Sequence, residues 1–96
     1  MKIIGLGKLR EFAEKHPDSR TPLDGWRKIV EQAEWRHLPD IKTTYSKSVD
    51  YVEGYLVFNI KGNNYRLIAQ INYRVKIVKI NDILTHADYD RGNWKK

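Results

Sequence analysis

The sequence predicts one α+β domain, in which a hairpin of two helices packs on one face of an antiparallel sheet. Three observations support this prediction. Apolar residues recur at the helical period in the N-terminal third, whereas residues 55–83 alternate apolar and polar side chains as strands do. A chain of 96 residues is also long enough for a single modest core. The expected element order is β-α-α-β-β-β, and residues 1–96 form one domain.

The N-terminal part is expected to contain a short strand and the two helices. The strand is Lys2–Ile4. The first helix spans Lys8–His16 and ends before Pro17, because proline cannot continue a helix. The second helix has Thr21 as its N-terminal cap and ends near Arg36. Its apolar residues form one stripe that needs a sheet to cover: Leu23, Trp26, Ile29, Val30 and Ala33.

Residues 37–54 carry only weak signals. We expect a turn at residues 37–40, a short helical turn at residues 40–42 and irregular chain at residues 45–48. Tyr51 and Val52 then precede the turn-forming pair Glu53 and Gly54. The expected element order therefore places no strand in this segment.

The C-terminal half is expected to form a three-stranded antiparallel meander. Its strands are Tyr55–Ile60, Tyr65–Asn72 and Val75–Ile83, and the glycine and asparagines of residues 61–64 favour a hairpin turn between the first two. One face of this sheet is apolar. The other face is mixed and carries Asn59, Arg66, Gln70 and Lys79.

Composition restricts the classes of function. Eighteen Lys and Arg against twelve Asp and Glu give a net charge of +6, which suits a polyanionic partner such as nucleic acid. The chain has no cysteine, and its three histidines are far apart in sequence, so we expect no metal and no cofactor. No apolar run approaches the roughly 20 residues of a membrane span, and no signal peptide is visible. The expected location is the cytoplasm.

The segment that follows the last expected strand, residues 85–94, is rich in reactive and stacking groups. It contains His86, Tyr89 and Trp94 together with two aspartates and an arginine. RNA cleavage by its own 2′-hydroxyl needs a base, an acid and a cation that stabilises the phosphorane. Histidine titrates near neutrality and arginine pairs with phosphate, so His86 and Arg66 suit that reaction.

Two phrases of the sequence carry a family resemblance. Val57–Ile68, followed by Leu84–Asp90, resembles the HigB-type mRNA interferase toxins, and the likeness extends over nearly the whole chain. The resemblance implies a RelE-like fold, cleavage of mRNA, often on the translating ribosome, and neutralisation by a cognate antitoxin of the helix-turn-helix, HigA-like kind. It carries over Arg66, His86 and Tyr89 as the catalytic positions.

Three further basic residues are predicted to bind RNA: Lys61, Arg74 and Lys79. Simpler interpretations remain open at this stage. Lys61 is also suited to a solvated hairpin position, Arg66 to an ion pair with Asp82 or Asp88, and Trp94 to a packing anchor for the tail. The alternative function is a non-catalytic RNA- or ribosome-binding module that uses the same basic face.

Overall fold

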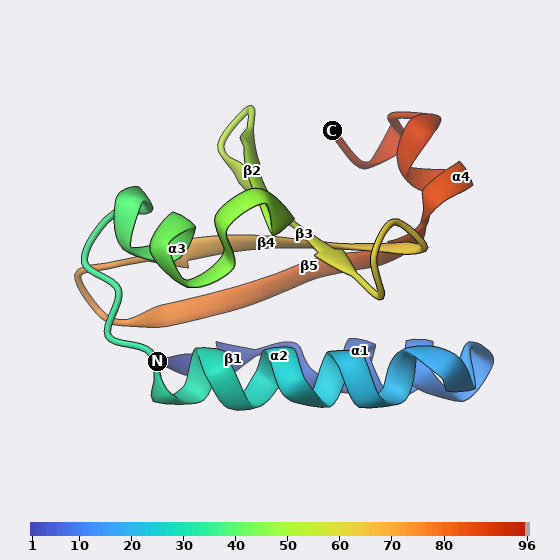
Figure 1. Ribbon diagram of the computed structural model, residues 1–96, viewed down its shortest axis with the longest axis horizontal. Helices are drawn as coiled ribbons and strands as arrows, with labels where there is room; N and C mark the ends of the chain where they lie inside the picture. The colour runs from blue at the N-terminus through green and yellow to red at the C-terminus, as the bar shows by residue number, and fades with distance from the viewer. Residues whose placement is uncertain (96) are drawn as a thin grey trace.

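The computed structural model describes residues 1–95 and confirms an α+β domain (Figure 1). Its strands are β1 (Lys2–Ile4), β2 (Val49–Val52), β3 (Tyr55–Ile60), β4 (Tyr65–Asn72) and β5 (Ile77–Thr85). Its α-helices are α1 (Leu6–Lys15), α2 (Arg20–Gln32), α3 (Leu38–Tyr45) and α4 (His86–Asp90). Short 3-10 turns lie at Pro17–Ser19, Ser46–Ser48 and Asn93–Lys95. No helix within residues 1–95 is both long enough and apolar enough to cross a bilayer.

The five strands form one mixed sheet in the order β1-β5-β4-β3-β2. Strands β2 to β5 are an antiparallel meander, as expected for the last three of them. Strand β1 joins at the edge, parallel to β5, with Ile3 opposite Val78. Helices α1 and α2 lie side by side in one layer against the sheet (Figure 1), so the predicted helical hairpin is confirmed.

Strand β2 and most of helix α3 are absent from the sequence prediction, which was wrong for residues 37–54. The short helical turn expected at residues 40–42 is the middle of α3, which begins next to Pro39 and fully buries Ile41. Edge strand β2 buries only Val49, so it shows no alternation that could identify it. Tertiary pairing with β3 supplies the regularity that the local sequence lacks.

Several element boundaries differ by a few residues. Helix α1 starts two residues early, at Leu6, because Gly5 adopts φ 99° and turns the chain directly out of β1. Helix α2 begins at Arg20 and ends at Gln32, since Ala33 is already extended with ψ 150°. Strand β5 runs from Ile77 to Thr85 rather than from residue 75 to residue 83.

The core lies between the apolar sheet face and the helices. Phe58 is its centre: it is fully buried, and its ring centroid lies 5.5 Å from that of Trp26 and 5.1 Å from that of Tyr45. Other large core residues that are almost completely buried are Leu23, Val30, Ile41, Leu56, Leu67, Val78 and Ile80. These contacts fix the sheet against α2 and α3 through aromatic edge-to-face packing.

The opposite sheet face is mixed, as predicted. Asn59 pairs with Arg66 across β3 and β4, and Val57 pairs with Ile68 one step further along. Val57 and Ile68 are both 1% exposed, so this face has a small apolar centre of its own. A β-bulge between Ile68 and Ala69 changes the register with β5, which is why both Ile80 and Ile83 reach the core.

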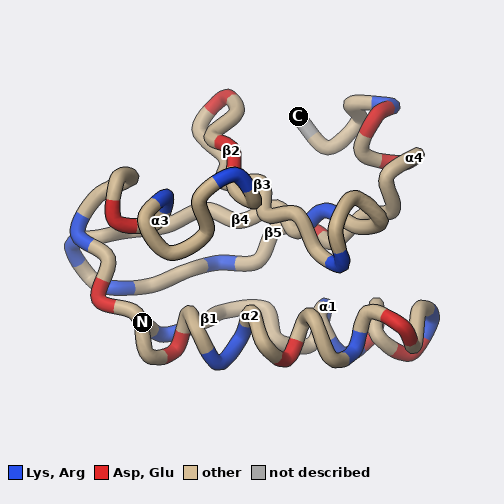
Figure 2. Tube along the Cα trace, viewed as in Figure 1, with Lys and Arg blue, Asp and Glu red and all other residues tan. Residues whose placement is uncertain are grey.

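Charge is distributed unevenly over the molecule. Lys, Arg, Asp and Glu are interspersed along α1 and α2, whereas the charged residues of the β4–β5 turn and the first half of β5 are Arg74, Lys76 and Lys79 (Figure 2). We call these three residues the β5 basic stripe. None of the three is acidic, so the stripe carries positive charge alone.

The buried hydroxyl of Tyr45 leads to a stability prediction. Within residues 1–95 this oxygen has no hydrogen-bond partner, and burial raises the pKa of Tyr45 from 10.0 to about 12. Tyr45→Phe removes an unpaired buried polar group and should stabilise the protein by about 1 kcal/mol near neutral pH. Because the raised pKa means that the folded state resists ionisation, wild-type stability should fall as pH rises from 10 toward 12, and the variant should lose less. Denaturant unfolding across this pH range measures both effects, and a less stable variant at neutral pH would contradict them.

Candidate active site

Arg66 is the central residue of the candidate site. It lies on β4, on the mixed face, and is only 9% exposed. Its Nη1 atom donates to the carbonyl oxygens of Asn63 and Tyr65, each at 3.1 Å. None of the ion pairs within residues 1–95 includes Arg66; Asp88, one of the partners considered from the sequence, pairs with Arg91 at 3.4 Å instead. The guanidinium is therefore buried without a carboxylate to neutralise it.

The C-terminal segment packs over this arginine through aromatic rings. The guanidinium carbon of Arg66 lies 5.4 Å from the ring centroid of Tyr89, a cation–π distance. Trp94 stacks in turn on the ring of Tyr89, with the two ring centroids 5.1 Å apart and the planes at 16° to each other. Its indole N–H donates to the Tyr89 carbonyl at 3.0 Å, and its ring also meets Tyr55. Trp94 is thus the anchor that the sequence suggested.

Tyr89 is a neutral hydrogen-bond donor in this setting. Burial raises the pKa of its hydroxyl above the ordinary value, and Asp50 and Asp90 raise it further, while Arg66 acts in the opposite direction. The net direction is upward, so the phenol keeps its proton at neutral pH. A protonated phenol beside a cation can donate to a phosphate oxygen or a leaving group.

His86 is the first residue of α4. Its backbone N–H donates to the carbonyl of Asn64 at 3.0 Å, which ties the start of the helix to the β3–β4 turn. The Thr85 hydroxyl caps the helix by accepting from the Asp88 N–H at 3.2 Å. The imidazole is half-exposed, and its Nδ1 atom lies 3.0 Å from the carboxylate of Asp90. This contact orients the ring and leaves Nε2 as the atom available to a substrate.

The structure brings only part of the predicted site together. Arg66 and Tyr89 are in contact, and the β3–β4 turn that holds Arg66 also holds the backbone of His86. We call these three residues the Arg66 cluster. Lys61 is not in it, since its ammonium extends to Asp18 and forms a 2.8 Å ion pair there. Lys79 shares the mixed face but pairs with Gln70, further along β4.

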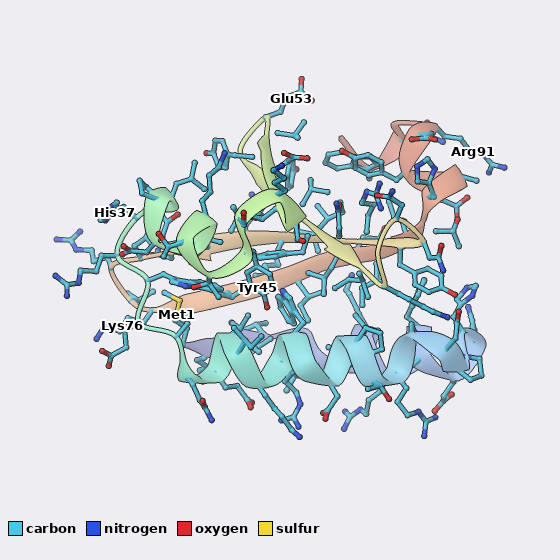
Figure 3. The ribbon with its side chains drawn as sticks, viewed as in Figure 1. Met1, His37, Tyr45, Glu53, Lys76 and Arg91 are labelled. Atoms are coloured by element: carbon cyan, nitrogen blue, oxygen red, sulfur yellow. The ribbon has the colours of Figure 1, made fainter. Side chains whose placement is uncertain are left out.

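Arg74 lies in the β4–β5 turn at the other end of the sheet. The part of β4 from Arg66 to its end at Asn72 separates them by about 20 Å, at roughly 3.3 Å a residue. Figure 3 shows Lys76, of the same turn, and Arg91, of the C-terminal segment, on opposite sides of the molecule. Any contact of Arg74 with RNA would therefore lie away from the reacting atoms.

Two contributions to the site were not recognised from the sequence. Asp90 was left without a role, although its i, i+4 spacing from His86 on a helix predicts the contact. The carbonyls of Asn63 and Asn64 hold Arg66 and His86, and a sequence shows no signal for such backbone contacts. Within residues 1–95 no three potential metal ligands come together.

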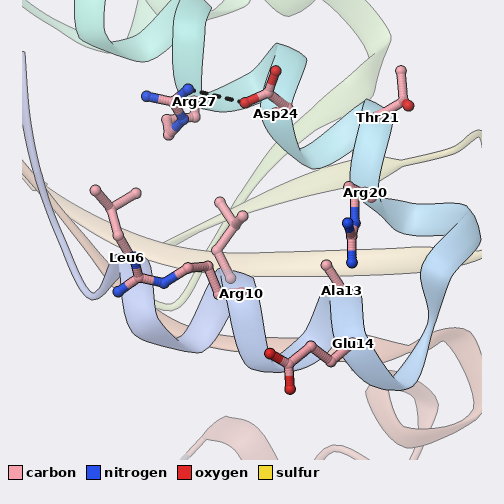
Figure 4. A pocket seen from close by; sticks show the side chains of 9 residues that line it. Leu6, Arg10, Ala13, Glu14, Arg20, Thr21, Asp24 and Arg27 are labelled. Atoms are coloured by element: carbon pink, nitrogen blue, oxygen red, sulfur yellow. Dashed lines mark hydrogen bonds and ion pairs between the residues drawn. The ribbon is translucent and has the colours of Figure 1, made fainter.

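A separate groove of about 690 Å³ lies between α1 and α2. Leu6, Leu9 and Ala13 line it on α1, and the ion pair of Asp24 with Arg27 lies on its α2 side (Figure 4). No residue of the Arg66 cluster lines this groove. The reactive groups lie instead on the open mixed face of the sheet.

Comparison with known proteins gives one family and several relatives. The model of a family described as "HigB_toxin, RelE-like toxic component of a toxin-antitoxin system" matches residues 19–92, a range that includes the whole Arg66 cluster. The chain is 25% identical over 92 residues to "mRNA interferase toxin HigB" of Escherichia coli K12, which covers 94% of this chain and 88% of that protein. It is 27% identical over 93 residues to "mRNA interferase HigB" of Escherichia coli O6:H1, strain CFT073, with 95% and 90% covered. The match to "mRNA interferase HigB" of Shigella flexneri is 25% identical over 92 residues.

The stack of Trp94 on Tyr89 predicts how firmly α4 is held. Trp94→Ala removes an aromatic pair and a hydrogen bond, which should lower the free energy of local opening of α4 by about 1–2 kcal/mol. Amide hydrogen exchange of residues 86–91 should accelerate by at least about tenfold, while the exchange of β3 and β4 changes little. Trp94→Phe keeps a stacked ring and should give a smaller effect. Equal protection of α4 in all three proteins would contradict this account.

Proposed function

The chain belongs to the HigB family of RelE-like toxins, and we propose that it is an endoribonuclease that cleaves mRNA without a metal ion. The names of its relatives support mRNA as the substrate. The observation that carries the proposal is Arg66, which is 9% exposed and whose guanidinium, among the described residues, contacts two carbonyl oxygens and an aromatic ring but no carboxylate. A buried charge without a counterion is costly, and a phosphate group would supply the missing negative charge.

In the proposed reaction the 2′-oxygen of the RNA attacks the adjacent phosphorus. The 2′-oxygen–phosphorus bond forms while the bond from phosphorus to the 5′-oxygen breaks. The 2′-hydroxyl gives up its proton and the leaving 5′-oxygen gains one, so the products are a 2′,3′-cyclic phosphate and a 5′-hydroxyl. Arg66 would bind the scissile phosphate and stabilise the negative charge of the phosphorane. His86 would transfer a proton through Nε2, with Asp90 holding Nδ1.

Tyr89 would complete the site as a donor or a stacking surface. Its raised pKa keeps the phenol protonated, so it suits a hydrogen bond to the phosphate or the leaving oxygen. Its ring is stacked by Trp94 on one side, and this fixes its orientation toward Arg66. Lys79 and Arg74 would contribute phosphate contacts at a distance, through the β5 basic stripe.

The partners follow from the family. As the toxic component of a toxin–antitoxin system, this chain has an antitoxin as its counterpart. We extend this proposal to a helix-turn-helix, HigA-like antitoxin, to action on the translating ribosome and to a cytoplasmic location, where mRNA is found.

Substitutions in the Arg66 cluster test the roles of its members. Arg66→Gln and His86→Ala should each lower the rate of mRNA cleavage by at least about 100-fold and relieve growth arrest when expressed in cells. Primer extension on cellular mRNA, after expression of each variant is induced, locates and quantifies the cleavage sites. If His86→Ala arrests growth and degrades mRNA as wild type does, His86 is not catalytic.

Arg74→Gln is the matched control, because it removes the same charge from the far end of the sheet. It should weaken RNA binding and reduce the slope of log binding constant against log salt concentration by about one. The cleavage rate at saturation should stay unchanged. If the wild-type protein binds RNA but never cleaves it, a non-catalytic RNA- or ribosome-binding module is favoured instead.

The chemistry itself is tested with a modified substrate. An mRNA with a single 2′-deoxy nucleotide on the 5′ side of the scissile phosphate should resist cleavage at that site, because the attacking oxygen is missing. Cleavage of the unmodified RNA on translating ribosomes should leave a 2′,3′-cyclic phosphate and a 5′-hydroxyl. Cleavage at the deoxy position, or a free 5′-phosphate on the product, would exclude this mechanism.

A further inference from the structure

We infer that Asp18, in the short turn between α1 and α2, is a positioning residue for the Arg66 cluster. It braces the β3–β4 turn, residues 61–64, whose carbonyls hold both Arg66 and His86. This inference rests on the proposed function, because it assigns Asp18 to the same reaction.

Asp18 binds both ends of that turn with one carboxylate. Its Oδ2 atom accepts from the ammonium of Lys61 at 2.8 Å, and its Oδ1 atom accepts from the hydroxyl of Tyr65 at 2.6 Å. Lys61 follows β3 directly and Tyr65 opens β4. The carboxylate therefore spans the turn from the helix side of the sheet.

The same turn holds the Arg66 cluster on its other side. The Asn63 carbonyl accepts from Arg66 Nη1 at 3.1 Å, and the next carbonyl along the chain, that of Asn64, accepts from the His86 N–H at 3.0 Å. These two carbonyls set the position of the guanidinium relative to the start of α4. A rotation of the turn would move both groups away from a shared phosphate.

The turn has a reason to need an external brace. Lys61 adopts φ 52° and Gly62 adopts φ 63°, and the left-handed region is unfavourable for a lysine. Within the turn, one backbone hydrogen bond, from Asn64 N–H to the Lys61 carbonyl, spans 3.2 Å. Two charged or polar contacts from outside then offset the strain at Lys61.

The residues around the base of the brace are well packed. Ser19, the neighbour of Asp18, is fully buried, and its hydroxyl donates to the carbonyl of His16 at 2.6 Å. The rings of Phe12 and His16 stack at 4.5 Å, and the Tyr65 ring packs on both, at 5.2 Å and 5.3 Å. Asp18 itself is partly exposed, but its neighbours and the Tyr65 ring connect it to the packed helical layer.

The lowered pKa of Asp18 agrees with this geometry. Lys61 is the largest cause and Tyr65 the next, and both favour the charged carboxylate. The brace is therefore fully present above the ordinary pKa of 3.8 and is lost only as pH falls below it. Asp18 remains ionised across the whole neutral range in which RNA cleavage would be assayed.

Asp18→Asn and Tyr65→Phe test the inference, with Asp24→Asn as the matched control. Asp24 pairs with Arg27 at 2.9 Å and with Lys28 at 3.3 Å on α2, so its substitution removes the same charge and similar ion pairs without touching the turn. Tyr65→Phe keeps the ring packing and removes only the hydroxyl, which protects the test if Asp18→Asn is poorly folded. Circular dichroism selects a temperature at which every variant is folded.

The first measurement is cleavage of a reporter mRNA in a reconstituted translation reaction at increasing toxin concentrations. Asp18→Asn should lower the maximal rate by about tenfold and change the half-saturating concentration by less than about twofold, because misplaced groups slow the chemical step. Tyr65→Phe should give a smaller loss of the same kind. Asp24→Asn should match wild type.

The second measurement is amide exchange at His86, which a general loss of stability would not single out. Asp18→Asn should accelerate exchange of the His86 N–H by about tenfold relative to the β3 and β4 amides, whereas Asp24→Asn should not. Lys61→Met should reproduce the Asp18→Asn behaviour. If Lys61 serves mainly to bind phosphate, Lys61→Met raises the half-saturating concentration and Asp18→Asn lowers it, and the inference is overturned.

The outcomes separate this inference from the proposed function. Wild-type cleavage with equal maximal rates and equal His86 exchange in Asp18→Asn would overturn the role of Asp18 and leave the function intact. Absence of cleavage by wild type would overturn the function. Amide exchange at His86 then still tests whether Asp18 braces the turn. Selective acceleration in Asp18→Asn supports this role, and unchanged exchange rejects it.

Discussion

Arg66 is buried and, in the part of the chain that the structure describes, has no carboxylate partner; the rest of the site depends on this constraint. A cation in that state needs its hydrogen bonds satisfied by neighbours that do not cancel its charge. The β3–β4 turn meets this need with the carbonyls of Asn63 and Tyr65, and Tyr89 covers the guanidinium with the face of its ring. Each of these contacts compensates part of the desolvation and leaves the net charge free for an anion. The surrounding residues thus hold the guanidinium in a fixed position in which it can bind an anion.

The two faces of the sheet accordingly serve different purposes. The helix-facing side is a close-packed core centred on Phe58, and it provides most of the stability. The other face has a small apolar centre of Val57 and Ile68, and the C-terminal segment packs beside it. A helix as short as α4 has no stability of its own. Its position depends on the Thr85 cap, the Asn64 carbonyl and the Trp94 stack, so the placement of His86 is a tertiary property.

The parts that sequence reasoning predicted are those with a local physical signal. Strands β3 and β4 were predicted to the residue, because their alternation is clear and the Gly–Asn turn separates them. Strand β2 and helix α3 have few buried residues, so their patterns were too weak to read. Of the motif residues, Arg66 and Tyr89 are in contact, and His86 is tied by its backbone to the turn that holds Arg66. The contacts of Asp18 with Lys61 and Tyr65 span 43 and 47 residues, and no local pattern predicts pairs so far apart.

The fate of Lys61 explains how a chain with net charge +6 can build a selective site. The fold separates the cations of the sheet. Lys61 pairs with Asp18, Arg66 is enclosed under Tyr89, and the β5 basic stripe lies toward the far end of the sheet. Carboxylates of Asp88 and Asp90 stand close to the cluster, so its surroundings are not strongly positive. General attraction to RNA therefore comes from dispersed lysines and arginines. A single arginine with fixed geometry is left for the phosphate at which charge develops. Catalysis depends on stabilising that charge in the transition state, not on binding all of the RNA equally well. This division of the cations therefore favours the cleavage reaction over nonspecific RNA binding.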